Sequence, residues 1–161
     1  RTGFTLIELL LVVSIIAILT GLMIVVINPT ALLAKARDAK RMNEINELHK
    51  ALYLALAEGE IALSSTTGCS DCTSLSGTNA VTGAGYVKFS IPSGKTGLSK
   101  YIHVLPLDPT NNGTLVFTYG SNGTSYELNV PLESADNTSK MTTDGGNSST
   151  LYEVGTALTV L

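Results

Sequence analysis

The amino-acid sequence lacks charge over one long stretch, and it lacks the groups of residues on which most enzymes depend. No Asp, Glu, Lys or Arg occurs from Leu9 to Ala34. The chain contains two His and two Cys, and no serine–histidine–acid, cysteine–histidine or paired-carboxylate arrangement stands out. A glycine-rich loop that binds phosphate is also missing. These absences argue against an enzyme.

A basic surface is missing from the second part of the chain. Residues 60–161 contain eight acidic and four basic side chains, and the whole chain has a formal net charge of −3. Domains that bind nucleic acid present clustered Lys and Arg, so this composition gives no reason to expect a nucleic-acid partner. The same residues are rich in Ser, Thr, Gly and Asn, which suits the exposed part of an extracellular protein.

The uncharged stretch is long enough to span a membrane. Leu9–Ile27 comprises 19 almost wholly aliphatic residues, and at ~1.5 Å per residue they form a helix of about 28 Å, close to the ~30 Å of a hydrocarbon core. The apolar region of a secretory signal peptide is shorter, roughly 7–15 residues, and ends at a small-residue cleavage site. No such site follows here, so we expect the segment to be retained.

A second helical segment follows Asn28 and Pro29. Apolar residues recur there at steps of three or four, as on one face of a helix: Leu32, Ala36, Ala39, Met42, Ile45, Leu48, Leu52 and Leu56. Pro has no amide hydrogen and disfavours the helical conformation of the residue before it. We therefore expect a kink or a local interruption at Asn28 and Pro29, with the helix resuming until Gly59. We expect the apolar face to pack on the rest of the chain and the basic cluster Lys35–Arg41 to be solvated.

The whole helical rod is too long for its own chain to cover. From Phe4 to Glu58 it spans about 80 Å, whereas a domain of ~100 residues has a radius of gyration near ~13 Å. The first half must then be covered by lipid or by other copies of the chain. Glu8 is the only charge between Thr2 and Ala34, and a carboxylate inside a membrane costs roughly 2.5 kcal/mol or more and marks a functional position. The alternative is that Glu8 lies at the level of the lipid headgroups.

The segment Gly3–Glu8, Gly-Phe-Thr-Leu-Ile-Glu, resembles the processing site of type IV prepilins and of type II secretion pseudopilins. In that family a membrane peptidase cuts after the Gly, the new terminal Phe is N-methylated, and a Glu stands at the fifth mature position. The resemblance implies a cut between Gly3 and Phe4, with residues 1–3 as a leader remnant. It also implies that Glu8 acts in assembly by pairing with the Phe4 amino group of a neighbouring subunit. In an unprocessed chain, Arg1 is the alternative partner for Glu8.

The remainder of the chain predicts a small β-rich head. Alternating patterns and turn residues predict strands within 87–91, 115–119, 126–130 and 151–161, with Asn122 and Gly123 in a hairpin turn. The predicted fold class is α+β, with an antiparallel sheet of three or four strands on the second half of the long helix. The predicted segments are the leader remnant 1–3, the hydrophobic helix half 4–30, the amphipathic helix half 31–59 and the head 60–161.

Cys69 and Cys72 are the only cysteines. In the cytosol a C-x-x-C pair is a candidate for redox chemistry or for half of a metal site, but zinc needs two further ligands, and His49 and His103 are isolated. On an exported head we expect a short-loop disulfide. We expect no cofactor. A calcium loop formed by 136–137 and 144–147 is the other candidate, but without EF-hand spacing a plain acidic turn is favoured.

These features together predict a major pilin, the structural subunit of a type IV pilus-like filament. Such a chain resides in the inner (cytoplasmic) membrane before assembly and in a cell-surface filament afterwards. The partners implied by the resemblance are other copies of the chain, a prepilin peptidase and the inner-membrane assembly machinery. The alternatives are the major pseudopilin of a type II secretion system, in which the family tends to carry a calcium loop near the C-terminus, a minor pilin, or a membrane-anchored binding module that does not polymerise.

Overall fold

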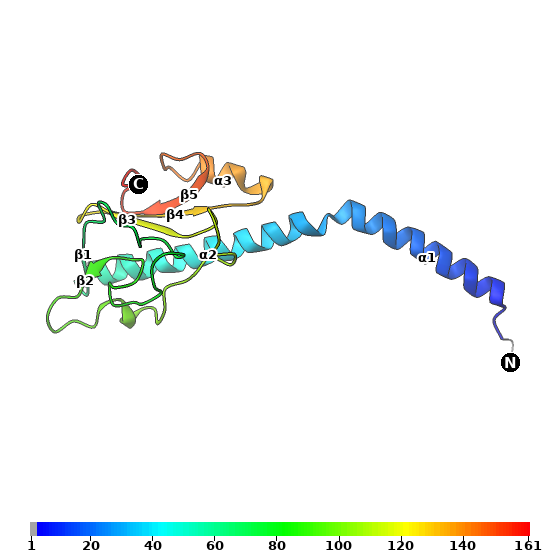
Figure 1. The fold of residues 1–161 in the computed structure, drawn as a ribbon, viewed down its shortest axis with the longest axis horizontal. Coiled ribbons are helices and arrows are strands. Elements are labelled where there is room, and N and C mark those ends of the chain that lie inside the picture. Colours follow the sequence, from blue (N-terminus) through cyan, green and yellow to red (C-terminus); the bar gives the residue numbers. More distant parts are fainter. Residues whose placement is uncertain (1–2) are drawn as a thin grey trace. The chain divides into compact units, whose positions relative to one another are not determined.

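The computed structural model describes residues 3–161, so Arg1 and Thr2 of the predicted leader remnant lie outside the described residues. The elements follow the order α1 (Leu6–Ile27), α2 (Pro29–Ala57), β1 (Ala62–Leu63), β2 (Phe89–Ser90), η1 (Gly97–Lys100), β3 (Thr118–Ser121), β4 (Tyr126–Pro131), η2 (Ala135–Asn137), α3 (Thr138–Thr142) and β5 (Leu151–Gly155), where η marks a 3₁₀ helix (Figure 1). The chain divides into two compact units, the first ending at Ala34 and the second beginning at Lys35. The predicted α+β class, with helix followed by antiparallel sheet, is confirmed.

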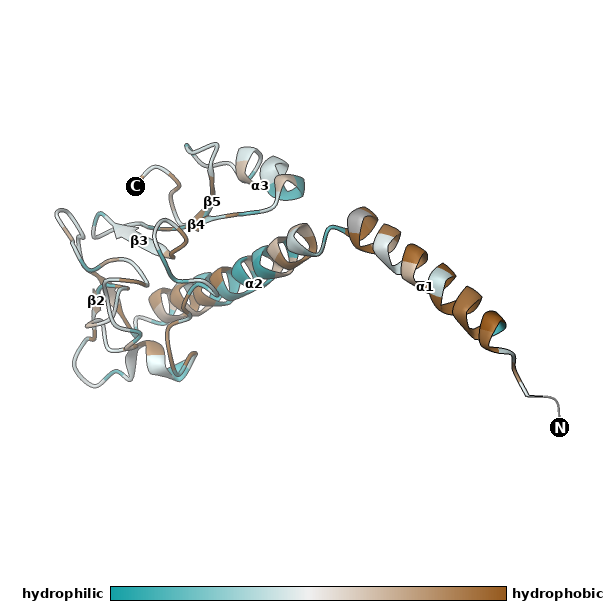
Figure 2. Ribbon diagram, turned by 45° about the vertical axis from the view of Figure 1, so that its right-hand side comes forward, coloured by the Kyte–Doolittle hydropathy of each residue, from teal (hydrophilic) through white to brown (hydrophobic). Residues whose placement is uncertain are grey.

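The few polar groups of α1 are satisfied within the helix itself. The hydroxyls of Ser14 and Thr20 donate hydrogen bonds to the carbonyl oxygens of Leu11 and Ile16, each at 2.8 Å. Figure 2 shows the hydrophobic colour along almost the whole of α1, in contrast to the mixed colours of α2. These two hydroxyls therefore need no polar partner from outside the helix, as a segment that spans hydrocarbon requires.

A single residue separates α1 from α2. Asn28 adopts the left-handed conformation, with φ 44° and ψ 77°, which Asn tolerates better than most residues. Its carbonyl oxygen accepts hydrogen bonds from the backbone N–H groups of Ala31 and Leu32, at 3.1 and 3.3 Å. Pro29 is the first residue of α2, where its missing N–H has no helical partner to lose. Asn28 therefore ends one helix and caps the next.

The buried apolar face of α2 lies in its second half. Ile45, Leu48, Ala51, Leu52 and Ala55 are buried there against the sheet residues of the head. The prediction that the apolar face packs on the head from Leu32 onward is wrong for its first part, because Leu32, Ala36 and Ala39 are exposed. Asp38 and Arg41 occupy the buried positions instead.

Arg41 is the centre of a buried cluster of charges. Its Nε and Nη2 atoms donate to the two carboxylate oxygens of Asp108, at 2.6 and 2.9 Å. Its Nη1 atom contacts Asp38 at 3.0 Å and Glu133 at 2.5 Å. The prediction that the cluster Lys35–Arg41 is solvated is therefore wrong for Arg41, whose exposed fraction is 0%, because three carboxylates replace its water.

The same cluster joins the segment after β4 to α2. Hydrogen bonds from Arg37 and Arg41 lower the pKa of Glu133 to about 2. The backbone N–H groups of Glu133 and Ser134 each donate to the Asp38 carboxylate at 2.8 Å. A carboxylate that accepts backbone donors and contacts a guanidinium compensates the cost of its burial. Both the side chains and the main chain of this segment are thus held by α2.

The strands form two antiparallel sheets. β4 lies between β3 and β5, with Tyr119 opposite Leu128 and Leu128 opposite Val154, while β1 and β2 form a separate pair. In Figure 1 the three-stranded sheet lies along α2, and β1 and β2 lie at the C-terminal end of α2.

The predicted strand boundaries need three corrections. The strand predicted within 87–91 is reduced to β2 and pairs with β1. The strand predicted from Leu115 begins at Thr118, because Leu115 exchanges backbone hydrogen bonds with Asn112 in a turn. The last strand ends at Gly155, close to the point where its partner β4 begins. The N–H groups of Thr156 and Ala157 both donate to the carbonyl oxygen of Tyr126, the first residue of β4.

Gly59 ends α2, as its position in the sequence suggested. Its φ of +63° lies in the left-handed region, which costs glycine little. The N–H of Gly59 bonds to the carbonyl of Leu56 at 3.0 Å, and that of Glu60 bonds to the carbonyl of Ala55 at 2.8 Å. These two bonds form a Schellman motif, so the chain leaves the helix in a defined direction toward β1.

Removing one carboxylate from the buried cluster is expected to destabilise the head strongly. Asp108→Asn keeps the shape of the side chain but removes a charge that faces Arg41, and breaking a buried ion pair on one side costs about 3–5 kcal/mol. Urea unfolding of the detergent-solubilised chain, followed by circular dichroism, measures the change. Lys35→Ala is the control, because its exposed pair with Asp136 contributes about 1 kcal/mol or less. Equal losses in the two variants would contradict this assignment.

Candidate functional site

Glu8 lies in the first turn of α1 and caps the start of its own helix. Its Oε2 atom accepts hydrogen bonds from the backbone N–H and the hydroxyl of Thr5, at 2.8 and 2.7 Å. The Thr5 hydroxyl oxygen in turn accepts from the backbone N–H of Glu8 at 3.3 Å. This reciprocal pair is a capping box, and it places a negative charge at the positive end of the helix dipole.

The capping role of Thr5 was not predicted from the sequence. The signal was present, because a Ser or Thr followed three residues later by Glu, ahead of an apolar run, is the pattern of a capping box. The bond from Thr5 uses one oxygen of Glu8, and no donor among residues 3–161 contacts the Oε1 atom within hydrogen-bond distance. The carboxylate is therefore oriented on one side and open on the other.

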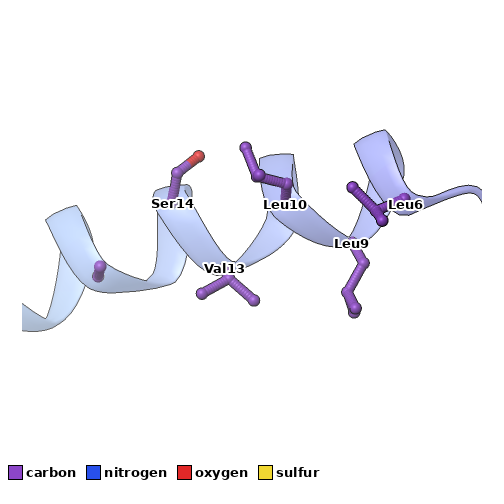
Figure 3. Close-up of a pocket in the computed structure, with 6 residues that line it drawn as sticks. Leu6, Leu9, Leu10, Val13 and Ser14 are labelled. Atoms are coloured by element: carbon purple, nitrogen blue, oxygen red, sulfur yellow. The ribbon is translucent and has the colours of Figure 1, made fainter.

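The rest of α1 is apolar and uncovered on every side. The segment Leu6–Ile24 is long and apolar enough to cross a membrane by length and composition, and none of it is buried within the chain. Figure 3 shows a shallow hollow on this helix, lined by Leu6, Leu9, Leu10, Val13, Ser14 and Ala17. All six residues belong to α1, so the hollow is a surface of one helix and not a cavity between elements.

Gly3 and Phe4 precede the helix and are exposed. The Phe4 side chain is 91% exposed, the largest value among the exposed apolar residues of the described chain. A Cβ atom added to Gly3 would meet nothing within 4 Å. Packing against the described residues therefore does not require glycine at this position.

The other residues singled out from the sequence lie away from Glu8. Asn28 and Pro29 stand beyond the opposite end of α1. Cys69 and Cys72 form a disulfide in the head, with their Cα atoms 5.8 Å apart. Among residues 3–161, they and Asp71 form the one group of three acidic, Cys or His side chains close enough to share a metal ion. The disulfide withdraws both thiolates from that use.

The two acidic turns considered for calcium have other contacts. Asp136 pairs with Lys35 at 3.1 Å, and the side-chain amide of Asn137 donates to Asp38 at 2.9 Å. The Asp144 carboxylate accepts from the backbone N–H groups of Gly146 and Glu153, at 3.0 and 2.9 Å. These contacts give each turn a structural role.

An exposed apolar helix with one acid at its start, followed by a small α+β head, is consistent with the architecture of a pilin-like protein. Residues 1–24 match the family model of the prokaryotic N-terminal methylation motif, the prepilin-type signal of type IV pilins and pseudopilins. The predicted prepilin-like N-terminus is thereby confirmed. No curated protein and no solved structure gives a match.

The motif supports a type IV pilin-like or pseudopilin protein. It implies processing by a prepilin peptidase and assembly into a pilus-like system, and with the apolar helix it suggests insertion into a membrane before assembly. The proteins that carry this motif are structural and not enzymatic.

The mature chain is expected to begin with N-methylated Phe4. Intact-mass analysis of the protein isolated from cells that contain a prepilin peptidase identifies the terminus. Gly3→Leu is expected to leave the precursor uncut, because the side chain lies next to the bond to be cleaved. The same change at Gly21, a helical glycine that also has open space around its Cβ position, is the control. A mature terminus at any residue other than Phe4 would contradict this cleavage site.

Proposed function

We propose that the chain is a major pilin, the repeating subunit of a type IV pilus-like filament. The observation that carries this proposal is α1, whose large aliphatic side chains are uncovered all around while Glu8 near its start is the only charge. An isolated chain in water would not tolerate such a surface. A membrane covers it before assembly, and the helices of other subunits cover it in the filament.

The apolar surface alone does not determine the axial position of a subunit in the filament. Lipid tails are as apolar as leucine, so exchanging lipid for neighbouring helices changes hydrophobic burial little. Close packing and polar contacts must then fix the axial position of each subunit. Glu8 is suited to this task, because its Oε2 atom is fixed by Thr5 and its Oε1 atom remains available to a partner.

The partner that fits Glu8 is the amino group of Phe4 in a neighbouring subunit. Cleavage after Gly3 turns an uncharged amide into a cation at the tip of the chain. In a helix bundle of low dielectric, that cation and the carboxylate each need the other, because an unpaired buried charge is strongly destabilising. The pair therefore favours one axial register and penalises the others.

Under this proposal, residues 4–30 form the filament core, 31–59 join the core to the head, and the head 60–161 forms the outer surface. The subunit resides in the cytoplasmic membrane before assembly and at the cell surface afterwards. A major pseudopilin, a minor pilin and a membrane-anchored module that does not polymerise share the same N-terminal features. Electron microscopy of sheared cells separates these classes, because only a major pilin supplies most of the mass of long surface filaments.

Glu8→Leu is expected to leave the subunit in the membrane but to reduce the number of filaments at least about tenfold, since a mispaired amino group costs more than about 1.4 kcal/mol per contact. Filament counts by negative-stain microscopy, with membrane levels by immunoblotting, measure the two quantities. Ser14→Ala is the matched control, because its hydroxyl bonds only to its own helix. Filaments of normal number and length from Glu8→Leu cells would rule out the pairing.

The single-residue interruption at Asn28 is expected to affect the mechanics of the filament. Replacing Asn28 and Pro29 with Ala removes the left-handed residue and restores the missing N–H donor, so a continuous helix becomes favourable. We expect a changed axial rise by cryo-electron microscopy and a reduced extension under force. Pro92→Ala, in a surface loop of the head, is the control. Unchanged rise and extension in the double variant would show that the interruption has no mechanical role.

A further inference from the structure

The outer face of the three-stranded sheet is polar and yet buried. Tyr119, Leu128 and Val154 share the face that packs toward the core. Because side chains alternate along a strand, Glu127 and Asn129 of β4 and Glu153 of β5 point to the opposite face. Their exposed fractions are 0%, 5% and 1%, whereas the outer face of such a sheet is ordinarily solvated.

Two segments of the chain cover this face. The backbone N–H groups of Val160 and Leu161 donate to Glu127 Oε2, at 2.7 and 3.0 Å. The N–H of Ser148 donates to Glu153 Oε2 at 2.9 Å. Gly146 approaches so closely that a Cβ atom added to it would collide with the Glu153 carboxylate. The C-terminal segment and the loop before β5 thus close over the two acids.

Each acid keeps one buried oxygen without a partner. Glu127 Oε1, Asn129 Oδ1 and Glu153 Oε1 are all buried and accept no hydrogen bond. Asn129 and Glu153 lie directly opposite each other in the sheet register, and Glu127 is two residues away from Asn129 on the same strand. The three residues are therefore neighbours on the same face of the sheet.

No cationic side chain in the described part of the chain pairs with these acids. The ion pairs among residues 3–161 involve neither Glu127 nor Glu153. Burial and contact with the Glu127 carboxyl raise the pKa of Glu153 above its ordinary value. Two neighbouring buried carboxylates are unfavourable unless a cation or a proton lies between them.

We propose that Glu127, Asn129 and Glu153 form a binding site for a hard divalent cation of the calcium type. Carboxylate and amide oxygens are the ligands that such ions take, and calcium accepts the irregular geometry that a sheet face and two covering segments provide. Backbone N–H groups hold the Oε2 atoms and so orient both carboxylates, as hydrogen-bond donors to ligand side chains do in metal sites. Water molecules supply the remaining ligands. The proposed ligands differ from the polar groups of the turns at 136–137 and 144–147, which have the contacts described above, although Gly146 lies against the Glu153 carboxylate.

Calcium titration of the purified full-length protein in detergent, after treatment with a chelator, tests this site. Calorimetry is expected to give one saturable binding event, and calcium to raise the midpoint of thermal unfolding. Glu127→Gln and Glu153→Gln preserve shape and are expected to raise Kd at least about tenfold. Asn129→Asp adds a third charge and is expected to lower Kd. Asp136→Asn, at an exposed acid of the same head, is the control and is expected to leave Kd unchanged.

Three results would overturn the proposal. One is the absence of saturable binding at millimolar calcium. Another is calcium stabilisation that persists in the Glu127→Gln, Glu153→Gln double variant, since the ion then binds elsewhere. The third combines two observations: calcium does not change the stability of the wild type, and Glu153→Gln is more stable than the wild type at pH 7. The two acids then share a proton and do not bind a cation. Magnesium at equal ionic strength separates specific binding from screening.

Discussion

The structure depends on one constraint, which is that no element of the described residues 3–161 covers α1. Its Ser14 and Thr20 hydroxyls bond to its own backbone, the aliphatic side chains of Leu6–Ile24 are exposed, and the second compact unit begins only at Lys35. Everything that the helix packs against must therefore come from outside the molecule. Glu8 is important because of this constraint. A charge at the edge of an uncovered apolar surface limits the surroundings in which the helix is stable.

The head meets the opposite requirement, since under the proposed function it must remain folded while α1 passes from the membrane into the filament. Its attachment to α2 combines a buried apolar face around Leu48 and Leu52 with the Arg41 cluster. Apolar packing tolerates small sliding movements, but a guanidinium held by Asp38, Asp108 and Glu133 does not. The charged contacts thus fix the register between the helix and the head, while the apolar contacts supply most of the hydrophobic stabilisation.

Features written in local sequence were predictable, and features that depend on distant partners were not. The apolar run and the α+β class follow from composition and periodicity, and the prepilin-like signal follows from the resemblance of Gly3–Glu8 to a known processing site. The structure and the motif match bear these predictions out. The burial of Arg41 was missed, because nothing near it in sequence shows that Asp108 and Glu133 will meet it. The burial of Glu127 was not predicted either, because only the fold shows that Val160 and Leu161 return over that face of the sheet. The short β1–β2 pair likewise forms only because the chain between these strands folds back and places β2 beside β1.

Under the proposed function, the capping box has a consequence for a subunit that is still in the membrane. Because Thr5 already occupies one oxygen of Glu8, the acid has hydrogen-bond donors while no neighbour is present. In the proposed assembly, an arriving amino group would meet a carboxylate whose orientation is already set, so little rearrangement would be needed on contact. One threonine hydroxyl would thus both stabilise the unassembled subunit and speed its docking.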